Sequence, residues 1–346
     1  MSGDGEAAGF ERVSRQHRNK EEVSESKSSN LRIIGGTAVS EEERLQNFPW
    51  IAMLGGSLPR CGGAIISEWW ILTAAHCVLN AAETQIIPAS DSQRVYFGCS
   101  DLHSTSYPCQ QRIVKEIVAN PCFDPCCDYH DIAMLKVDKA MPKEWIGEID
   151  GSRTNIPVPL FPFDISKEKV VMMGWGSTCG DGRCVPSVLQ KLEVPVSSMQ
   201  KCRDVNPVNN GVSSGHCGQA GRCKNLFEYG HVICAGGAMA DQGGYDSCNG
   251  DSGSPVAWKS NTGWRIVGLV ILGSEWPQSD WRCGAVGRHS VLTATAAYVD
   301  FVNATISKTS YDCNKKKNTV LSAASSLSVN IILQAFLAVA PLLSYL

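Results

Sequence analysis

The amino-acid sequence predicts an all-β fold that ends in one helix. Between residues 33 and 306, short apolar runs are broken by clusters of Gly, Pro, Asn and Asp, which is typical of many short antiparallel strands. The clearest of these runs are residues 63–66, 70–75, 95–98, 170–175 and 267–272. No repeat of fixed period is present, so a repeat architecture is not expected.

One segment has the periodicity of a helix, residues 294–306. Tyr298, Val302 and Ile306 recur every fourth residue there, and Val299 extends the same apolar stripe. This spacing predicts a single terminal helix packed on the β body.

Composition excludes nucleic acid as a partner and indicates an oxidising compartment. The net charge of -3 comes from 31 basic and 34 acidic residues without long single-sign blocks, so no basic surface is expected. Sixteen cysteines are far more than a cytosolic chain carries. Zinc is the alternative explanation, but Cys122, Cys126 and Cys127 lack a second matching pair and histidines at ligand spacing. A disulfide framework is therefore favoured.

The N-terminal residues 1–32 are expected to form a disordered leader that is removed. They are polar and highly charged, with too few apolar residues to offset the entropy of ordering. They also contain no apolar stretch of the kind that a secretory signal requires. Because the cysteines indicate export, we expect the sequence to begin downstream of its true start, with unconventional export as the alternative.

The C-terminus indicates attachment to a membrane. After a linker at residues 309–328, residues 329–346 are mostly apolar, and no charged residue occurs from 319 onward. Small residues at 322–326, a spacer and a terminal apolar tail match a GPI-attachment signal. A transmembrane helix ranks second, because the run is marginal for crossing a bilayer and has no basic residue beyond it. A buried terminal helix ranks third.

Three separated motifs suggest acyl-transfer chemistry. Ser252 lies in the string Gly-Asp-Ser-Gly-Ser-Pro at 250–255, where a tight turn exposes a hydroxyl beside backbone N–H groups. His76 lies in Thr-Ala-Ala-His-Cys and Asp131 in Asp-Ile-Ala-Met-Leu. Taken singly, these are a core histidine, a turn aspartate and a surface serine, but together they follow a known chain order of a catalytic triad.

With these motifs, residues 33–306 resemble the chymotrypsin-like (trypsin-fold) serine proteases. The resemblance implies two six-stranded antiparallel β-barrels, the first at about 33–155 and the second at about 156–308, with the active site between them. His76 and Asp131 would come from the first barrel and Ser252 from the second.

The resemblance also implies a role for each site residue. Ser252 attacks the peptide carbonyl, His76 transfers the proton and Asp131 fixes the imidazole tautomer. The N–H groups of Gly250 and Ser252 would stabilise the oxyanion. Two alternatives remain, namely a catalytically silent binding module of the same fold and a protease of elastase- or chymotrypsin-like preference.

Activation and substrate choice follow from the same resemblance. Cleavage after Arg32 would free the α-amino group of Ile33, whose partner would be Asp251.

The primary pocket would have Asp246 at its floor, followed by Ser247, with Gly273 on one wall, and would favour Arg or Lys. Ser290 replaces a pocket-wall glycine and should narrow the pocket while keeping it polar. Ser254 replaces a glycine after the nucleophile.

The resemblance pairs six cysteines, and close spacing suggests three further bridges. The first set is Cys61–Cys77, Cys202–Cys234 and Cys248–Cys283, and the second is Cys99–Cys109, Cys179–Cys184 and Cys217–Cys223. The pairing of Cys122, Cys126, Cys127 and Cys313 stays open.

No cofactor and no metal are expected; the loop at 99–109 holds Asp101 as its one acidic residue, too few for calcium. Asn303 lies in the one glycosylation sequon.

The expected partners are protein or peptide substrates, an activating protease, protein inhibitors and, through the tail, a membrane. The expected location is extracellular, at the cell surface or secreted.

Overall fold

The chain divides into two compact units, residues 1–30 and 31–346, and every residue with a described structure belongs to the second. The computed structural model describes residues 33–313 except 34, 57–59, 81, 83, 126, 128, 150–168, 180–182, 206–230, 237–245, 273–282 and 284–288. The predicted leader, most of the linker and the apolar tail therefore lie outside the described residues.

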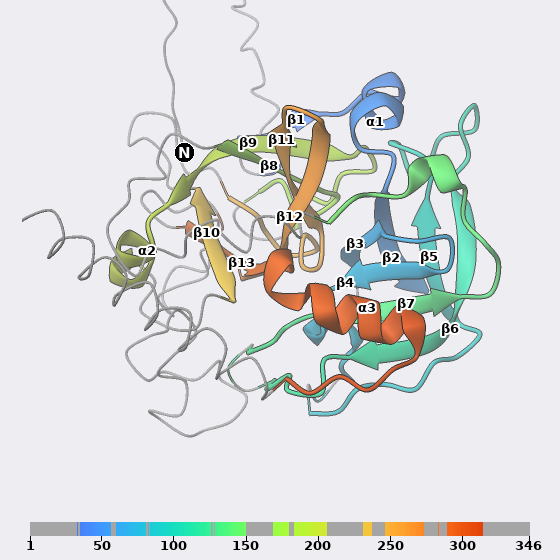
Figure 1. The fold of residues 1–346 in the computed structure, drawn as a ribbon. Coiled ribbons are helices and arrows are strands. Elements are labelled where there is room, and N and C mark those ends of the chain that lie inside the picture. Colours follow the sequence, from blue (N-terminus) through green and yellow to red (C-terminus); the bar gives the residue numbers. More distant parts are fainter. Residues whose placement is uncertain are drawn as a thin grey trace, which may run out of the picture. The chain divides into compact units, whose positions relative to one another are not determined.

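The N-terminal half of the described chain forms a closed six-stranded antiparallel barrel in the order β2-β3-β4-β7-β6-β5 (Figure 1). Its strands are β2 (Ile51–Gly56), β3 (Cys61–Ile65), β4 (Trp70–Thr73), β5 (Gln93–Phe97), β6 (Gln110–Ala119) and β7 (Ala133–Val137). Along β5, buried and partly exposed residues alternate, as expected for a strand with one face toward the core. β3 and β4 are buried throughout.

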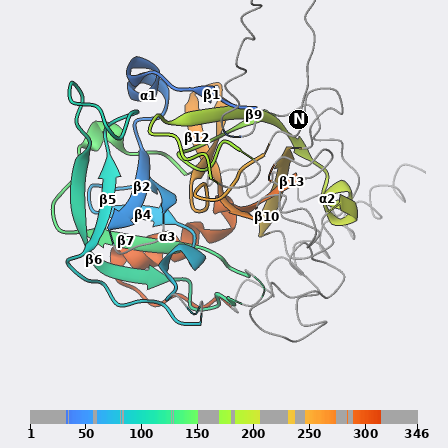
Figure 2. The ribbon, with the colours of Figure 1, turned by 180° about the vertical axis from the view of Figure 1, so that it is seen from behind.

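The C-terminal half forms a second closed barrel, seen from behind in Figure 2. Its sheet has the order β9-β10-β13-β12-β11-β8 and closes where β8 pairs with β9. The short strand β1 (Thr37–Ala38) pairs with β9 at Gln190 and Lys191. The strands are β8 (Lys169–Gly174), β9 (Gln190–Ser197), β10 (Val232–Gly236), β11 (Pro255–Ser260), β12 (Gly263–Leu272) and β13 (His289–Ala294). The predicted pair of six-stranded antiparallel barrels is confirmed.

The largest of three hydrophobic clusters joins the two barrels. The largest cluster of buried side chains includes Trp50 and Ile51 from the first barrel together with Met173 and Ile266 from the second. The ring of Phe48 lies 5.1 Å from that of Trp264. Because interiors pack at the density of organic crystals, this shared cluster holds the described strands of the two barrels against each other.

The helix predicted at residues 294–306 begins later than expected. Ala294 is the last residue of β13 and pairs with Gly268, so α3 begins only at Val299 (Val299–Ser307), after a 3-10 turn at Thr295–Tyr298. The side chains of Tyr298, Phe301 and Val302 pack on Trp70 and Met134, so α3 covers β4 and β7 (Figure 1). The helix that follows the second barrel is thus packed on the first.

Two short helices were missed by the periodicity argument. They are α1 (Glu41–Asn47) and α2 (Met199–Val205). The signal for α1 was present in the sequence, because Ser40 precedes it and accepts a hydrogen bond from Glu43 N at 3.1 Å. A serine followed three residues later by glutamate is a pattern typical of a helix N-terminus.

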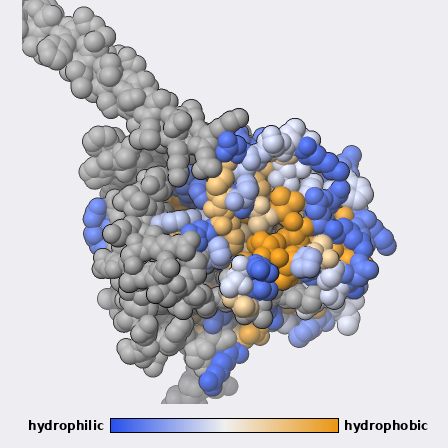
Figure 3. Space-filling view, turned by 90° about the horizontal axis from the view of Figure 1, so that it is seen from below, coloured by the Kyte–Doolittle hydropathy of each residue, from blue (hydrophilic) through white to orange (hydrophobic). Residues whose placement is uncertain are grey.

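The surface of the described residues carries both hydrophilic and hydrophobic side chains. In the face shown in Figure 3, apolar residues gather in the centre among hydrophilic ones. Within the described residues, no helix is long and apolar enough to cross a membrane.

Candidate active site

His76 and Asp131 are brought together by the pairing of β4 with β7. His76 follows β4 and Asp131 precedes β7, and in that antiparallel pair Thr73 lies opposite Ala133. The distance between His76 Nδ1 and Asp131 Oδ2 is 2.6 Å, and His76 N donates to Asp131 Oδ1 at 2.9 Å. Thr293 of the second barrel donates to the Asp131 carbonyl at 2.7 Å. Both barrels therefore fix this pair.

The contacts determine which nitrogen of the imidazole carries the proton. The Asp131 carboxylate is fully buried, while the His76 side chain is 25% exposed. A buried carboxylate oxygen 2.6 Å from Nδ1 requires the proton there, which leaves a lone pair on Nε2. This is the tautomer that a general base at Nε2 would require.

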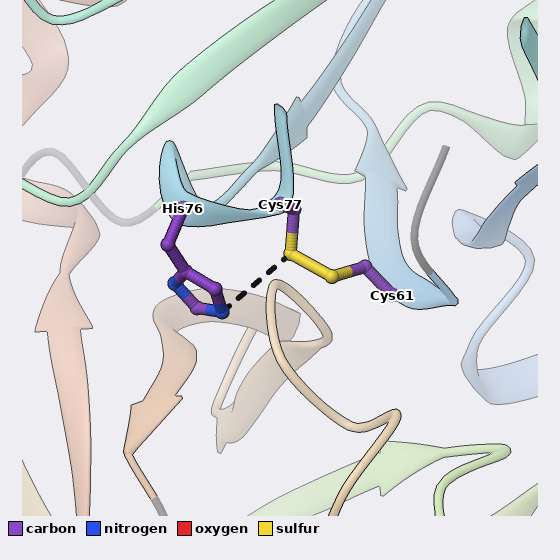
Figure 4. Close-up of side chains that lie close together, drawn as sticks. All are labelled: Cys61, His76 and Cys77. Carbon is purple, nitrogen blue, oxygen red and sulfur yellow. Dashed lines mark hydrogen bonds between the residues drawn. A yellow bond between two sulfur atoms is a disulfide. The ribbon is translucent and has the colours of Figure 1, made fainter. Parts of the chain in front are cut away.

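A metal does not fit beside this histidine. The ligand atoms of Cys61, His76 and Cys77 lie within 4.8 Å of one another, and Cys77 Sγ is 3.8 Å from His76 Nε2 (Figure 4). However, Cys61 and Cys77 form a disulfide. Metals bind thiolates, and a disulfide offers none. The group is thus a packing contact behind the imidazole.

The loop carrying Ser252 is docked on the first barrel. Gly62 N donates to Ser252 O at 2.7 Å, which fixes the loop against β3. Gly253 has φ +71°, and a Cβ there would lie 2.3 Å from Thr73 Oγ1, so only glycine allows this approach to β4. Ser252 is half-buried, and within the described residues its hydroxyl makes no hydrogen bond, including none to His76.

The backbone of this loop leaves two amides available for an oxyanion. The N–H groups of Asp251, Gly253 and Ser254 donate to carbonyls inside the fold. By contrast, those of Gly250 and Ser252 donate to no other described residue. Gly250 has φ +95°, a conformation suited to glycine. The two expected oxyanion donors are therefore the amides that the fold does not use.

Asp251 is a buried acid that forms no ion pair with any described residue. Its side chain accepts from Gly176 N at 2.8 Å and Cys248 N at 3.0 Å, and it is 1% exposed. Burial raises the pKa of Asp251 to about 7, against the two backbone hydrogen bonds, which lower it. Ile33 is buried in the hydrophobic cluster of the second barrel, and its backbone φ is 25°. Arg32 lies outside the described residues.

The raised pKa predicts a pH-dependent stability of the uncut chain. An acid whose folded pKa exceeds its unfolded value of 3.8 destabilises the fold increasingly as the pH rises from about 4 to about 7. Asparagine has one oxygen for the two backbone N–H groups, which adds a cost that is the same at every pH. We expect the unfolding free energy of Asp251→Asn, relative to that of the parent, to rise across this window by on the order of 4 kcal/mol. Urea unfolding midpoints of the uncut chain at pH 4 to 8 measure the difference. A difference that is the same at every pH would contradict the assignment.

Three polar side chains meet at the expected floor of the pocket. Asp246, Ser247 and Ser290 are all buried, and Ser290 Oγ donates to Asp246 Oδ1. The hydroxyls of Ser247 and Ser290 are 3.0 Å apart. Ser290 is thus a hydrogen-bond partner of the Asp246 carboxylate. Gly273 lies outside the described residues.

Comparison with known proteins supplies the family. A family model described as Trypsin matches residues 33–302, which is more than half of the chain. This chain belongs to the trypsin family. It is a serine endopeptidase, a hydrolase with the two-barrel fold of that family.

Similar proteins include coagulation factors and a transmembrane protease. This trypsin-family protease is 27% identical over 278 residues to coagulation factor IX of Cavia porcellus, covering 78% of the chain and 80% of that protein. It is 28% identical to coagulation factor XI of Bos taurus, over 78% of the chain but 37% of that protein. It is also 28% identical to transmembrane protease serine 11C of Mus musculus, over 78% of the chain and 53% of that protein.

Six disulfides lie in the described part of the protease. Five are pairs expected from the sequence, and the sixth joins two cysteines whose pairing was open. They are Cys61–Cys77, Cys99–Cys109, Cys179–Cys184, Cys202–Cys234, Cys248–Cys283 and, newly, Cys122–Cys313. Cys127 is also disulfide-bonded, whereas Cys126, Cys217 and Cys223 lie outside the described residues.

The Cys122–Cys313 bridge attaches the segment after α3 to the loop that leads to Asp131. Next to it, the ring of Tyr311 packs on Phe301 at 5.4 Å. At the other end of that loop, Asn120 N donates to Ile132 O at 2.9 Å. The segment after α3 is thus attached to the loop that contains Asp131. The spacing of the cysteines did not indicate this pair.

Two further sequence features have clear positions. Asn303, the sequon asparagine, is exposed on α3. Ser254 is fully buried, and among the described residues its hydroxyl has no hydrogen-bond partner. Within the described structure, the hydroxyl therefore occupies space in the loop that carries Ser252 without adding a hydrogen bond to it.

Proposed function

We propose that this protease cleaves peptide bonds after Arg or Lys by an acyl-enzyme mechanism, with Ser252 as nucleophile, His76 as general base and Asp131 as its orienting acid. The observation that carries the proposal is the His76–Asp131 pair, in which a buried carboxylate accepts two hydrogen bonds from one histidine. The docking of the Ser252 loop on β3 and β4 supports it, because this brings the loop to the strands that lead to His76.

The reaction would use these groups in two stages. His76 Nε2 takes the proton of Ser252 Oγ as the oxygen attacks the peptide carbonyl, and the amides of Gly250 and Ser252 donate to the resulting oxyanion. The imidazolium then gives its proton to the leaving amine, and the C–N bond breaks. Water repeats the sequence on the acyl-enzyme and restores the serine.

Substrate preference would come from Asp246. Its carboxylate is 1% exposed, and its partners include the hydroxyl of Ser290. A buried carboxylate is stabilised by a cationic side chain that enters the pocket, whereas a neutral side chain leaves it uncompensated. The proposed preference for Arg and Lys follows from this charge.

Replacing Asp246 tests the preference directly. We expect Asp246→Ser in the activated enzyme to lower kcat/KM for an arginyl amide about 100- to 1000-fold, because one partner of a buried ion pair is lost. Matched Arg, Lys, Phe and Ala amides, assayed with parent and variant, measure the change. If the parent preferred the Phe or Ala amide, the proposed specificity would be wrong.

We also propose that the protease is made as a zymogen cut after Arg32. In the uncut chain Asp251 is buried with backbone amides as its hydrogen-bond donors. A new α-amino group at Ile33 would offer this acid a cation and lower its pKa, so cutting would stabilise the loop that carries Ser252. N-terminal sequencing of active material should give Ile33 as the first residue.

The site of action is proposed to be extracellular. Secreted clotting factors and a transmembrane protease among the similar proteins are consistent with this, as are the disulfides. Attachment to a membrane through residues 329–346, preferably by a GPI anchor, and regulation by an activating protease and by protein inhibitors remain proposals from the sequence.

A further inference from the structure

Arg60 is an exposed cation held beside the nucleophile loop. It precedes Cys61, the first residue of β3, and its Cγ and Cδ lie 3.9 Å from the position that a Cβ on Gly250 would take. Its Nη2 donates to Pro186 O at 3.2 Å. Pro186 follows Cys184, which is bonded to Cys179. The guanidinium is therefore bonded to the loop that contains Pro186, and the aliphatic part of the side chain lies beside the loop that carries Ser252.

The charge of Arg60 has no ion-pair partner in the part of the chain that the structure describes. Among the described residues no carboxylate lies within ion-pair distance of it, and its one hydrogen bond goes to a neutral carbonyl. Partial desolvation lowers the pKa of Arg60, and the nearby charge of Asp251 opposes this shift. An arginine remains charged at every pH at which the enzyme would work. With four further N–H donors, the guanidinium can bind a carboxylate in bidentate geometry.

The position of Arg60 relative to the scissile bond follows from the chemistry of the site. The residue before the bond enters the pocket above Asp246, whereas the leaving amine must lie next to His76 Nε2, which protonates it. That nitrogen faces the Cys61–Cys77 disulfide (Figure 4). Arg60 directly precedes Cys61 in the chain, and the aliphatic part of its side chain lies beside Gly250. It therefore flanks the path of the leaving part of the substrate chain.

We propose that Arg60 is a specificity-determining residue that binds an acidic side chain at the first or second position after the scissile bond. The inference rests on the proposed function, and it adds a preference on the leaving side to the preference for Arg or Lys. No local pattern singles out Arg60, because its contacts with Pro186 and Gly250 join segments that are far apart in the chain.

The test uses the activated full-length enzyme and three quenched peptides with Arg before the scissile bond. The peptides differ only in carrying Glu, Gln or Lys at both positions after it. For the parent we expect kcat/KM for the Glu peptide to exceed that for its Gln isostere about three- to fivefold, which corresponds to the free energy of an exposed ion pair. At high salt the value for the Glu peptide should fall toward that for the Gln peptide. Arg60→Gln should bring the Glu/Gln ratio to about one, and Arg60→Glu should favour the Lys peptide.

Each ratio is taken within one variant, so a general loss of activity cancels. Lys139→Gln is the matched control, because it removes an exposed positive charge just beyond the end of β7 that is distant from Asp131, and it should keep the parent ratio. A Glu/Gln ratio of about one in the parent, or a ratio unchanged in Arg60→Gln, would overturn the inference. Hydrolysis of an arginyl amide is assayed in parallel. Its absence in the parent would count against the proposed function, whereas its presence with a flat ratio would count against Arg60 alone.

Discussion

Replacing Ser252 with alanine is expected to lower kcat for peptide hydrolysis about a millionfold, the scale found when a triad nucleophile is removed from a serine protease. The hydroxyl supplies the attacking oxygen, and no other described side chain on the docked loop can take its place, because Ser254 is fully buried. The amides of Gly250 and Ser252 stay in position, so substrate should still bind. Single-turnover assays on an arginyl amide, together with binding of the uncleaved peptide, measure both parts.

Ser254→Ala is the matched control for this variant. It removes the same hydroxyl two residues away, where the group makes no hydrogen bond within the described structure. We expect it to keep parent activity, with unfolding free energy unchanged or raised by about 1 kcal/mol, since an unsatisfied buried polar group is lost. Full activity in Ser252→Ala, or equal inactivation by both substitutions, would show that the nucleophile has been misassigned.

Asp131→Asn is expected to lower kcat about ten-thousandfold while the fold is retained. Both carboxylate oxygens accept hydrogen bonds, one from His76 N and one from Nδ1. The backbone N–H is always a donor, so the single oxygen of asparagine must face it, and the NH₂ group then faces Nδ1. The imidazole proton would move to Nε2, which could no longer accept the proton of Ser252.

The control for the aspartate is Asp138→Asn. Asp138 lies just after β7, and its Oδ1 accepts from Ile113 N at 2.9 Å, a contact that an asparagine oxygen can keep. We therefore expect parent kcat and parent stability from this variant. Measurement of kcat and of urea unfolding for both variants separates an effect on the imidazole from general destabilisation. An Asp131→Asn enzyme within tenfold of the parent would contradict the tautomer argument.

Much of the fold was predictable because its signals are local. The apolar runs at 70–75 and 170–175 became β4 and β8, since a strand needs only a short apolar stretch with turn residues at its ends. The N-terminus of the terminal helix was not predictable in this way. Ala294 has the same apolar character in a strand as in a helix, and its pairing with Gly268 decides for the strand.

The family, the two-barrel fold and the candidate residues could be predicted from the amino-acid sequence, because the motifs around His76 and Ser252 each consist of consecutive residues. How those motifs meet depends on the three-dimensional fold. The pairing of β4 with β7 sets the His76–Asp131 contact, and the contact of Gly253 with Thr73 places the nucleophile loop. The partners of Arg60, Asp251 and Cys122 likewise come from distant segments. Such contacts depend on the packing of the whole chain, and no local pattern encodes them.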